Sequence, residues 1–259
     1  MSIFPAGGGF TIDGVNNETW RVYCQKYSIS VIPGLRASLI AVPGRTGKKS
    51  AGVEIDSRIV RLSLSCFNTN RTGLLQNLRD FSAAVDPRVG SHKLILTDDD
   101  PMYFINVIPT SEVPTSPEFV KADFEIQFEA ADPHWYYVNA RSYSLTANNA
   151  TPMVVDNING NAITPPTFTI TRLTAGIVTG IILTYNNSNF TYNGSLGAGD
   201  TLVVNMDNFT VLKNGINDIA NWGGDDFPQL GVGAARSITW HDTNNVGANV
   251  TIAYNERSI

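Results

Sequence analysis

Residues 119–130 alternate apolar and polar side chains more regularly than any other part of the chain. The apolar positions are Phe119, Phe124, Ile126, Phe128 and Ala130. The alternating polar positions are Lys121, Asp123, Glu125, Gln127 and Glu129. A period of two is that of a β-strand with one buried face and one wet face, which is typical of antiparallel sheets. The segment therefore predicts such a strand, ending at Ala131-Asp132-Pro133.

A single segment has the period of an amphipathic helix instead. Its apolar residues recur at steps of three and four and are Leu74, Leu75, Leu78, Phe81 and Val85. Asn70 or Thr72 can cap its start, and Asp86-Pro87 ends it because proline disfavours helical geometry in the preceding residue. We predict one helix over about residues 71–85, packed on a sheet by its apolar stripe.

A polar segment interrupts the strands near the N-terminus. Strands are predicted over 20–32, 35–42 and 53–67, whereas residues 43–52 contain no apolar residue larger than alanine. Such a segment predicts an exposed hairpin arm. Its positive residues Arg45, Lys48 and Lys49 are candidates for contact with a neighbouring molecule, and a solvated loop tip is the equally weighted alternative.

The second half of the chain contains only short strands. They are predicted at 167–172, 180–186, 190–194, 200–206, 209–215, 235–240 and 249–256. Asn193-Gly194 and Lys213-Asn214-Gly215 predict hairpin turns, because Asn and Gly tolerate positive φ. Strands at this spacing favour a sandwich or jelly roll. The chain is thus predicted to be mainly β, with a helix-bearing domain over 1–143 and an all-β domain over 144–259.

Composition excludes several function classes. The net charge of −5 argues against a surface that binds nucleic acid phosphates. No run of about 18 apolar residues exists to span a membrane, and the N-terminus lacks the features of a signal peptide. Cys24 and Cys66 each lie in an apolar run, which favours two buried free thiols over a disulfide.

The candidates for chemistry are few. Asp98-Asp99-Asp100 has consecutive acids followed by proline, which suits a turn better than the spaced ligands of a calcium loop. Asp132 and His134 could form an acid/base pair, but Pro133 between them extends the chain, so the two side chains need not face each other. We favour a strand end whose aromatic residues, Trp135 and Tyr136, cover the domain core. No catalytic residue, metal site or cofactor is predicted.

The order of several segments carries a family resemblance. These segments are TDDDPMYF (97–104), FEIQFEAADPHWY (124–136), GAGDTLVVN (197–205), KNGIN (213–217) and FPQLGVGAARSI (227–238). Together they resemble the distal tail proteins (Dit) of phages with long, non-contractile tails. The sequence departs from the family pattern at Ala234-Ala235-Arg236, where a Gly-x-Asn is expected.

The resemblance implies a structural role without catalysis. Members of that family form hexameric rings at the tail tip, and their first domains surround the channel for DNA. The implied partners are further copies of the chain, the tail tube protein, the tail-associated hub protein and a receptor-binding protein. The second domain is expected to be a galectin- or carbohydrate-module-like sandwich. The implied location is the virion tail, after assembly in the host cytoplasm.

Two other functions compete with this one. The second domain could bind host cell-wall saccharide by stacking on aromatic residues, for which the candidates are Trp222, Trp240, Tyr185 and Tyr192. A wall hydrolase would need two carboxylates separated by about 5–10 Å across a cleft. The adjacent acids Asp225 and Asp226, or Asp98 and Asp100 on one turn, do not suit that geometry.

Overall fold

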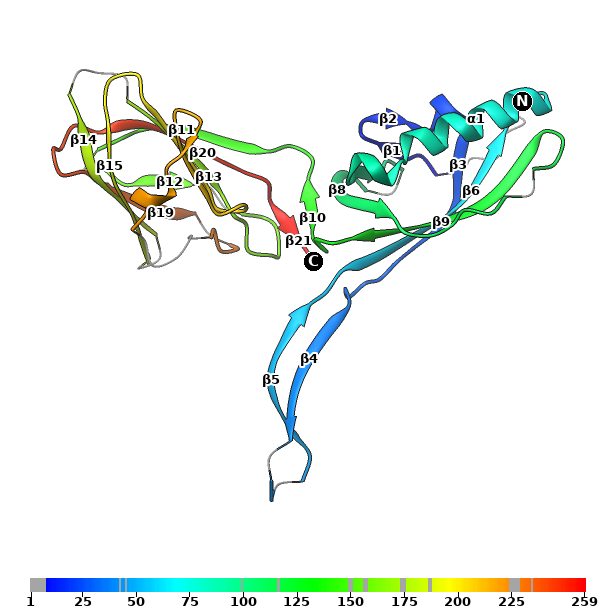
Figure 1. Cartoon of the computed structure of the whole chain (residues 1–259), viewed down its shortest axis with the longest axis horizontal. Helices are drawn as coiled ribbons and strands as arrows, with labels where there is room; N and C mark the ends of the chain where they lie inside the picture. The colour runs from blue at the N-terminus through cyan, green and yellow to red at the C-terminus, as the bar shows by residue number, and fades with distance from the viewer. Residues whose placement is uncertain are drawn as a thin grey trace. The chain divides into compact units, whose positions relative to one another are not determined.

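A computed structural model describes residues 8–41, 43–44, 46–98, 100–115, 117–148, 151–155, 158–172, 176–185, 188–223, 229–233 and 235–259. The chain divides into two compact units, with unit 1 running through Val138 and including Ile259, and unit 2 running from Asn139 to Ser258. The predicted mainly-β architecture with one α-helix is confirmed for the described residues (Figure 1). The sequence places the boundary after residue 143, where composition changes, but strand β11 of unit 2 already begins at Arg141.

Unit 1 is built from ten strands, one α-helix and two 3-10 turns among the described residues. They are β1 (Thr11–Ile12), β2 (Val15–Asn16), η1 (Asn17–Trp20), β3 (Val22–Ile29), β4 (Leu35–Ala41), β5 (Lys48–Ile55), β6 (Arg58–Phe67), α1 (Arg71–Ala84), η2 (Pro87–Val89), β7 (His92–Leu96), β8 (Asp100–Pro109), β9 (Lys121–Ala130) and β10 (Trp135–Tyr137). The main sheet has the order β2-β1-β7-β8-β9-β6-β3, and β10 pairs with β8.

Strand β9 confirms the predicted alternation of apolar and polar residues. Its buried residues are Ala122, Phe124, Ile126, Phe128 and Ala130, and the residues between them are at least partly accessible. Its partner β6 pairs with it over the whole length, from Arg58 opposite Ala130 to Phe67 opposite Lys121. Phe119, which the sequence places on the same face, precedes the strand and is 70% exposed.

The helix α1 lies within one residue of its predicted bounds. The Asn70 side chain caps it by accepting a hydrogen bond from the Gly73 amide at 2.8 Å. Phe81 anchors the helix, because its ring meets those of Phe10, Trp20 and Phe124 with centroids 6.5, 5.7 and 5.8 Å away. The predicted packing of the stripe against the sheet is confirmed.

The two cysteines are buried and are not joined in a disulfide, as the sequence predicts. Burial raises the pKa of the Cys66 thiol to about 11, so it behaves as a small apolar core residue.

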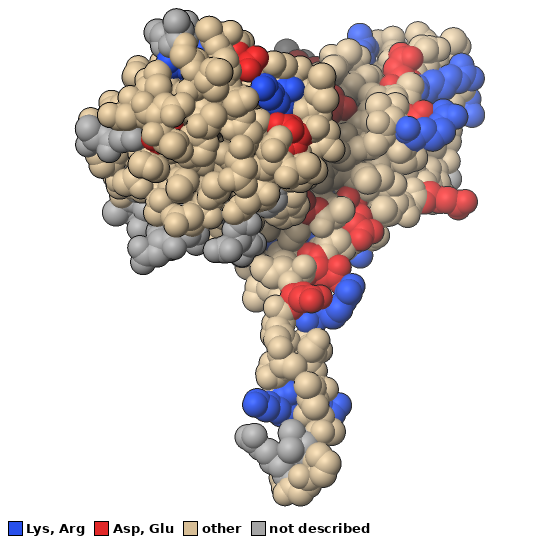
Figure 2. Space-filling view, turned by 60° about the vertical axis from the view of Figure 1, so that its left-hand side comes forward, with Lys and Arg blue, Asp and Glu red and all other residues tan. Residues whose placement is uncertain are grey.

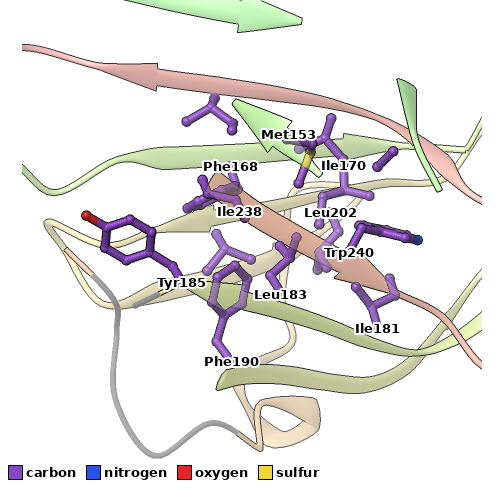
Figure 3. Packing of buried hydrophobic residues seen from close by; sticks show 14 of the residues in the cluster. Met153, Phe168, Ile170, Ile181, Leu183, Tyr185, Phe190, Leu202, Ile238 and Trp240 are labelled. Carbon is purple, nitrogen blue, oxygen red and sulfur yellow. The ribbon is translucent and has the colours of Figure 1, made fainter. Parts of the chain in front are cut away.

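Unit 2 contains the remaining described strands. They are β11 (Arg141–Ala147), β12 (Met153–Val155), β13 (Thr167–Thr171), β14 (Val178–Tyr185), β15 (Ser188–Leu196), β16 (Thr201–Asn205), β17 (Thr210–Lys213), β18 (Ile216–Asn217), β19 (Arg236–His241), β20 (Ala248–Tyr254) and β21 (Arg257–Ser258), with η3 at Ile219–Asn221. One sheet has the order β11-β20-β13-β16-β17-β18 and the other β12-β19-β14-β15. Phe168 and Leu202 from the first sheet and Leu183 and Trp240 from the second lie in one buried cluster (Figure 3).

One predicted turn of unit 2 is right and the other is wrong. Asn214-Gly215 joins β17 to β18 with φ values of 50° and 79°, as predicted. Asn193-Gly194, by contrast, lies inside β15. A Cβ on residue 194 would meet the Tyr192 hydroxyl oxygen at 2.3 Å and the nearest ring carbon at 2.4 Å, so this glycine allows a close approach rather than a turn.

Candidate assembly surface

The most exposed element of unit 1 is the hairpin of β4 and β5, which we call the arm. Every residue of both strands is exposed, and Figure 1 shows them leaving the sheet as a two-stranded ribbon. The predicted protruding hairpin is confirmed, but β5 begins at Lys48, so Lys48 and Lys49 lie in a strand rather than in a loop tip. Arg45 lies outside the described residues. The strand predicted over 53–67 is two strands, which break at Asp56-Ser57.

The arm has one apolar face along most of its length. Leu35 pairs with Ile55 and Ala37 with Val53, and Leu39 lies two residues further along the same side. These five residues define the apolar face of the arm. Its four larger side chains are 44–57% exposed. The sequence analysis considered the polar tip of the arm and did not predict this face. The signal was available, because apolar residues recur at every second position at 35, 37 and 39.

The opposite face of the arm carries most of its charge. On this face Arg36 lies opposite Glu54 on the neighbouring strand, and Ile40 lies opposite Lys49. Figure 2 shows Lys and Arg side chains toward the free end of the arm, and both basic and acidic side chains nearer its base. The arm is therefore amphipathic, with one largely apolar face and one face that carries most of its charge.

The base of the arm is closed by backbone hydrogen bonds. The Gly34 amide donates to the Ser57 carbonyl at 3.2 Å, and the Asp56 amide donates to the Gly34 carbonyl at 2.6 Å. Gly34 is suited to this position because an added Cβ would meet the Asp56 Cβ at 3.2 Å. The Arg36 guanidinium forms an ion pair with the Asp56 carboxylate, with an N–O distance of 3.2 Å. Both side chains are exposed, so this ion pair adds little stability.

A buried arginine connects the base of the arm to the turn after β9. Arg58 is 2% exposed; its Nε donates to the Pro133 carbonyl at 2.9 Å and its Nη1 donates to the Ser30 carbonyl at 2.8 Å. Burial lowers the pKa of this guanidinium from its usual value. Ser30 immediately follows β3, so one side chain holds the chain entering the arm and the Asp132-Pro133 turn together.

Asp132 and His134 do face each other, contrary to the expectation from Pro133. One Asp132 oxygen lies 2.5 Å from His134 Nδ1 and also accepts from the His134 amide, and the other accepts from the Tyr136 hydroxyl. Burial raises the pKa of Asp132, but the hydrogen bonds from His134 and Tyr136 outweigh that effect and bring it to about 2. The His134 amide and ring and the Tyr136 hydroxyl thus converge on the Asp132 carboxylate, and we call this cluster, which holds the turn together, the Asp132 lock.

The aromatic residues after this turn cover part of unit 1, as predicted. Trp135 packs against the buried cluster. Tyr136 stacks on Phe104 with ring centroids 5.3 Å apart and planes inclined by 19°. Within the described residues, no group of three or more His, Cys, Asp or Glu side chains could hold a metal ion.

Most of the proposed saccharide-stacking residues are buried. Tyr185, Tyr192 and Trp240 are 6%, 2% and 3% exposed, so their rings leave little surface for stacking on a sugar. Figure 3 shows Tyr185 and Trp240 among the buried residues of unit 2. Their polar tips are used inside unit 2: for example, Trp240 Nε1 donates to the buried Asp242 carboxylate at 2.9 Å. Trp222 is partly buried and stacks on Phe190 with ring centroids 5.4 Å apart.

Of the acidic residues considered for hydrolysis, the structure describes Asp98 and Asp100. Asp225 and Asp226 lie outside the described residues. Asp98 accepts a hydrogen bond from the Gly9 amide, and Asp100 accepts one from the Met102 amide, as turn residues do. No helix in the described part of the chain is long and apolar enough to cross a membrane.

Residues 159–257 match the family model described as the siphovirus-type tail component, C-terminal domain. This region, less than half of the chain, is similar to that family. The resemblance to distal tail proteins that the sequence predicts is thereby confirmed. No curated protein matches the chain in sequence.

The Dit fold extends beyond the matched region. The crystal structure of the SPP1 Dit protein (gp 19.1), described as a paradigm of the hub adsorption apparatus in phages that infect Gram-positive bacteria, has a TM-score of 0.73 and 14% identity over 97% of this chain and 99% of that one. The activated phage p2 baseplate with Sr contains a chain with a TM-score of 0.53 and 10% identity, over 95% of this chain and 97% of that one. At identities of 14% and 10%, these structural similarities show that the fold is shared.

Replacing Arg58 by Met tests its role at the base of the arm. The variant loses two charge-assisted hydrogen bonds and leaves two carbonyls without this donor, so we expect unfolding free energy to fall by about 2–3 kcal/mol. Amide exchange at Asp56 should also accelerate. Urea unfolding and hydrogen exchange measure both effects. Arg61→Met, on the exposed face of the same strand, is the control, and equal losses in the two variants would refute the assignment.

Replacing Asp132 by Asn tests the lock after β9. The pKa of Asp132 is lower in the folded protein than its unfolded value near 4. The ionised carboxylate therefore stabilises the fold at pH values above about 4, and this stabilisation is lost as the pH falls toward 2. Because the side chain is 38% exposed, we expect Asp132→Asn to lower stability by only about 1 kcal/mol at pH 7, and by less at lower pH. Urea unfolding across pH measures the difference, with exposed Asp80→Asn as control. A pH-independent difference would contradict this account.

Proposed function

We propose that the protein is a structural component of a phage tail tip. Six copies form a ring around the DNA channel, and the ring connects the tail tube to the tail-associated hub protein and the receptor-binding apparatus. The observation that carries the proposal is the Dit fold over 97% of the chain, together with the tail-component family match in unit 2. The role requires no catalysis and places the protein in the virion tail.

The arm is the element best suited to join neighbouring copies. An isolated two-stranded hairpin is marginally stable in water, and the apolar face of this one has no cover within its own strands. Burying that face against a neighbour would stabilise both the hairpin and the ring. A contact between different patches of identical copies is head-to-tail, and such contacts close into a ring when the rotation permits.

Charge favours another copy of this chain as the partner of the arm. Residues 35–55 contain four positive residues (Arg36, Arg45, Lys48, Lys49) and one negative residue (Glu54), a net charge of +3. The whole chain has −5, so the remainder carries −8. A positive arm on an otherwise acidic chain is attracted to the body of a neighbour. The same acidic balance limits adhesion of DNA that passes through the ring.

Charge on the apolar face of the arm should prevent ring formation. We expect the wild-type chain, alone or co-expressed with the hub and tail tube proteins, to form six-fold rings with a central hole. Leu39→Asp combined with Val53→Asp should leave monomers with unchanged circular dichroism, because buried unpaired carboxylates oppose the contact. Electron microscopy and light scattering measure the outcome.

The matched control is Ser38→Asp, which places one charge on the opposite face of the same strand and should leave the ring intact. Rings that survive the double substitution would exclude the arm as the joining surface. A wild-type chain that stays monomeric even with its partners present would refute the ring itself.

A further inference from the structure

Unit 1 has a second surface that combines accessible apolar side chains with charge, on the outer side of β8 and β10. Ile105 and Val107 of β8 are buried in the core. Because successive residues of a strand point to opposite sides, the even-numbered residues of β8 face outward. On β10, Tyr136 pairs with Phe104, and the Val138 amide donates to the Met102 carbonyl at 2.8 Å. The β8–β10 face is defined by Asp100, Met102, Phe104, Tyr136 and Val138.

The middle of the β8–β10 face is apolar. Met102 is 47% exposed, and Tyr136 and Val138 are partly exposed. Phe104 is buried beneath the Tyr136 ring that stacks on it. Tyrosine and methionine are enriched where proteins contact one another. The stacked pair gives this face a firm apolar base.

The two ends of the β8–β10 face carry opposite charges. At one end Asp100 is exposed and is the last of three consecutive acids in the sequence. At the other end the Lys93 ammonium lies 4.0 Å from the centre of the Phe104 ring. A partner with an apolar middle and one positive end therefore fits this face in one direction, with its positive end at Asp100.

The arm carries the complementary pattern on the side of its apolar face. Beyond Leu39, the next residue on this side of β4 is Ala41, which pairs with Lys48. Lys48 thus lies about 7 Å beyond the row of Leu39, and Asp100 lies about 7 Å from Met102 along β8, since two residues of a strand span that distance. Within the part of the chain that the structure describes, Lys48 and Asp100 have no ion-pair partner.

One turn holds both the base of the arm and the β8–β10 face. Arg58 donates to the Pro133 carbonyl at 2.9 Å, and the Tyr136 hydroxyl donates to the Asp132 carboxylate. The direction in which the arm leaves the sheet is therefore linked to the orientation of this face. Head-to-tail contacts close into a ring only when every copy repeats the same rotation. A rigid connection between the two surfaces favours that repetition.

We propose that the arm of one copy docks on the β8–β10 face of its neighbour, with Lys48 beside Asp100. The apolar face of the arm then packs against Met102, Tyr136 and Val138. This inference rests on the proposed ring and adds the surface that receives the arm. It also gives a role to the acidic turn before β8, whose residues suit neither a calcium loop nor a hydrolase.

Charge reversal tests the pairing of Lys48 with Asp100. Lys48→Asp and Asp100→Lys should each raise the protein concentration for half-maximal ring assembly at least about tenfold, because like charges then meet. Both substitutions in one chain restore opposite charges, so that concentration should return to within about threefold of the wild type. Light scattering over a dilution series measures it, with the hub and tail tube proteins present in every sample. Lys49→Asp, on the opposite face of the arm, is the matched control and should assemble as the wild type does.

A substitution in the apolar part of the β8–β10 face gives a second test that leaves the acidic turn intact. Val138→Asp should prevent assembly with unchanged circular dichroism, because it places a carboxylate under the apolar face of the arm. Phe119→Asp is the control, since Phe119 is 70% exposed elsewhere on unit 1.

Three outcomes would overturn docking on the β8–β10 face. They are rings that persist in both Lys48→Asp and Val138→Asp, a folded combined variant that does not recover assembly, and a loss of rings in Phe119→Asp but not in Val138→Asp. Each of them leaves the ring itself standing. A wild-type chain that stays monomeric with its partners present refutes the ring first, so the two failures are distinguishable.

Discussion

The buried guanidinium of Arg58 is the interaction on which the layout of unit 1 depends. A charged group is costly to bury unless its hydrogen bonds are provided. Here two carbonyls from distant parts of the chain accept from Nε and Nη1, while Nη2 is buried without a hydrogen-bond partner among the described residues. One carbonyl belongs to the segment entering the arm and the other to the turn after β9. The position where the arm leaves the sheet is therefore linked to the Asp132 lock, although these segments are far apart in sequence.

That linkage explains how an element without a core of its own can be presented for assembly. Backbone hydrogen bonds at Gly34 and the Arg58 contacts fix the base of the arm, while its strands stay fully exposed. The folding free energy of unit 1 supports the base, and the remaining apolar surface stays available for a partner. In the proposed ring, burial of the apolar face against a neighbouring copy would stabilise the outer arm.

The sequence predicts what depends on local periodicity. The alternation in β9, the stripe and cap of α1 and the Asn214-Gly215 turn all follow from neighbouring residues, and the structure confirms them. The sequence does not predict local structure that depends on a contact between segments that are far apart or folded back on each other. The Asn193-Gly194 pair predicts a turn, but Gly194 lies inside strand β15, where the close Tyr192 side chain leaves no room for a Cβ. Asp132 and His134 meet because the whole turn is folded back, which proline geometry at one residue does not reveal.

The same limit applies to the aromatic residues of unit 2 that were candidates for stacking on a saccharide. Tyrosine and tryptophan combine a large apolar ring with one polar group, so they serve equally well on a surface or in a core that supplies a partner. In unit 2 the core supplies it: Asp242 for Trp240, Asp218 for Tyr192 and the Gly231 amide for Tyr185. With these polar groups satisfied inside unit 2 and the rings buried, the same residue types that suit a stacking surface are here part of the core. Residue type alone therefore does not distinguish the two roles, because the contacts that decide between them come from distant segments of the chain.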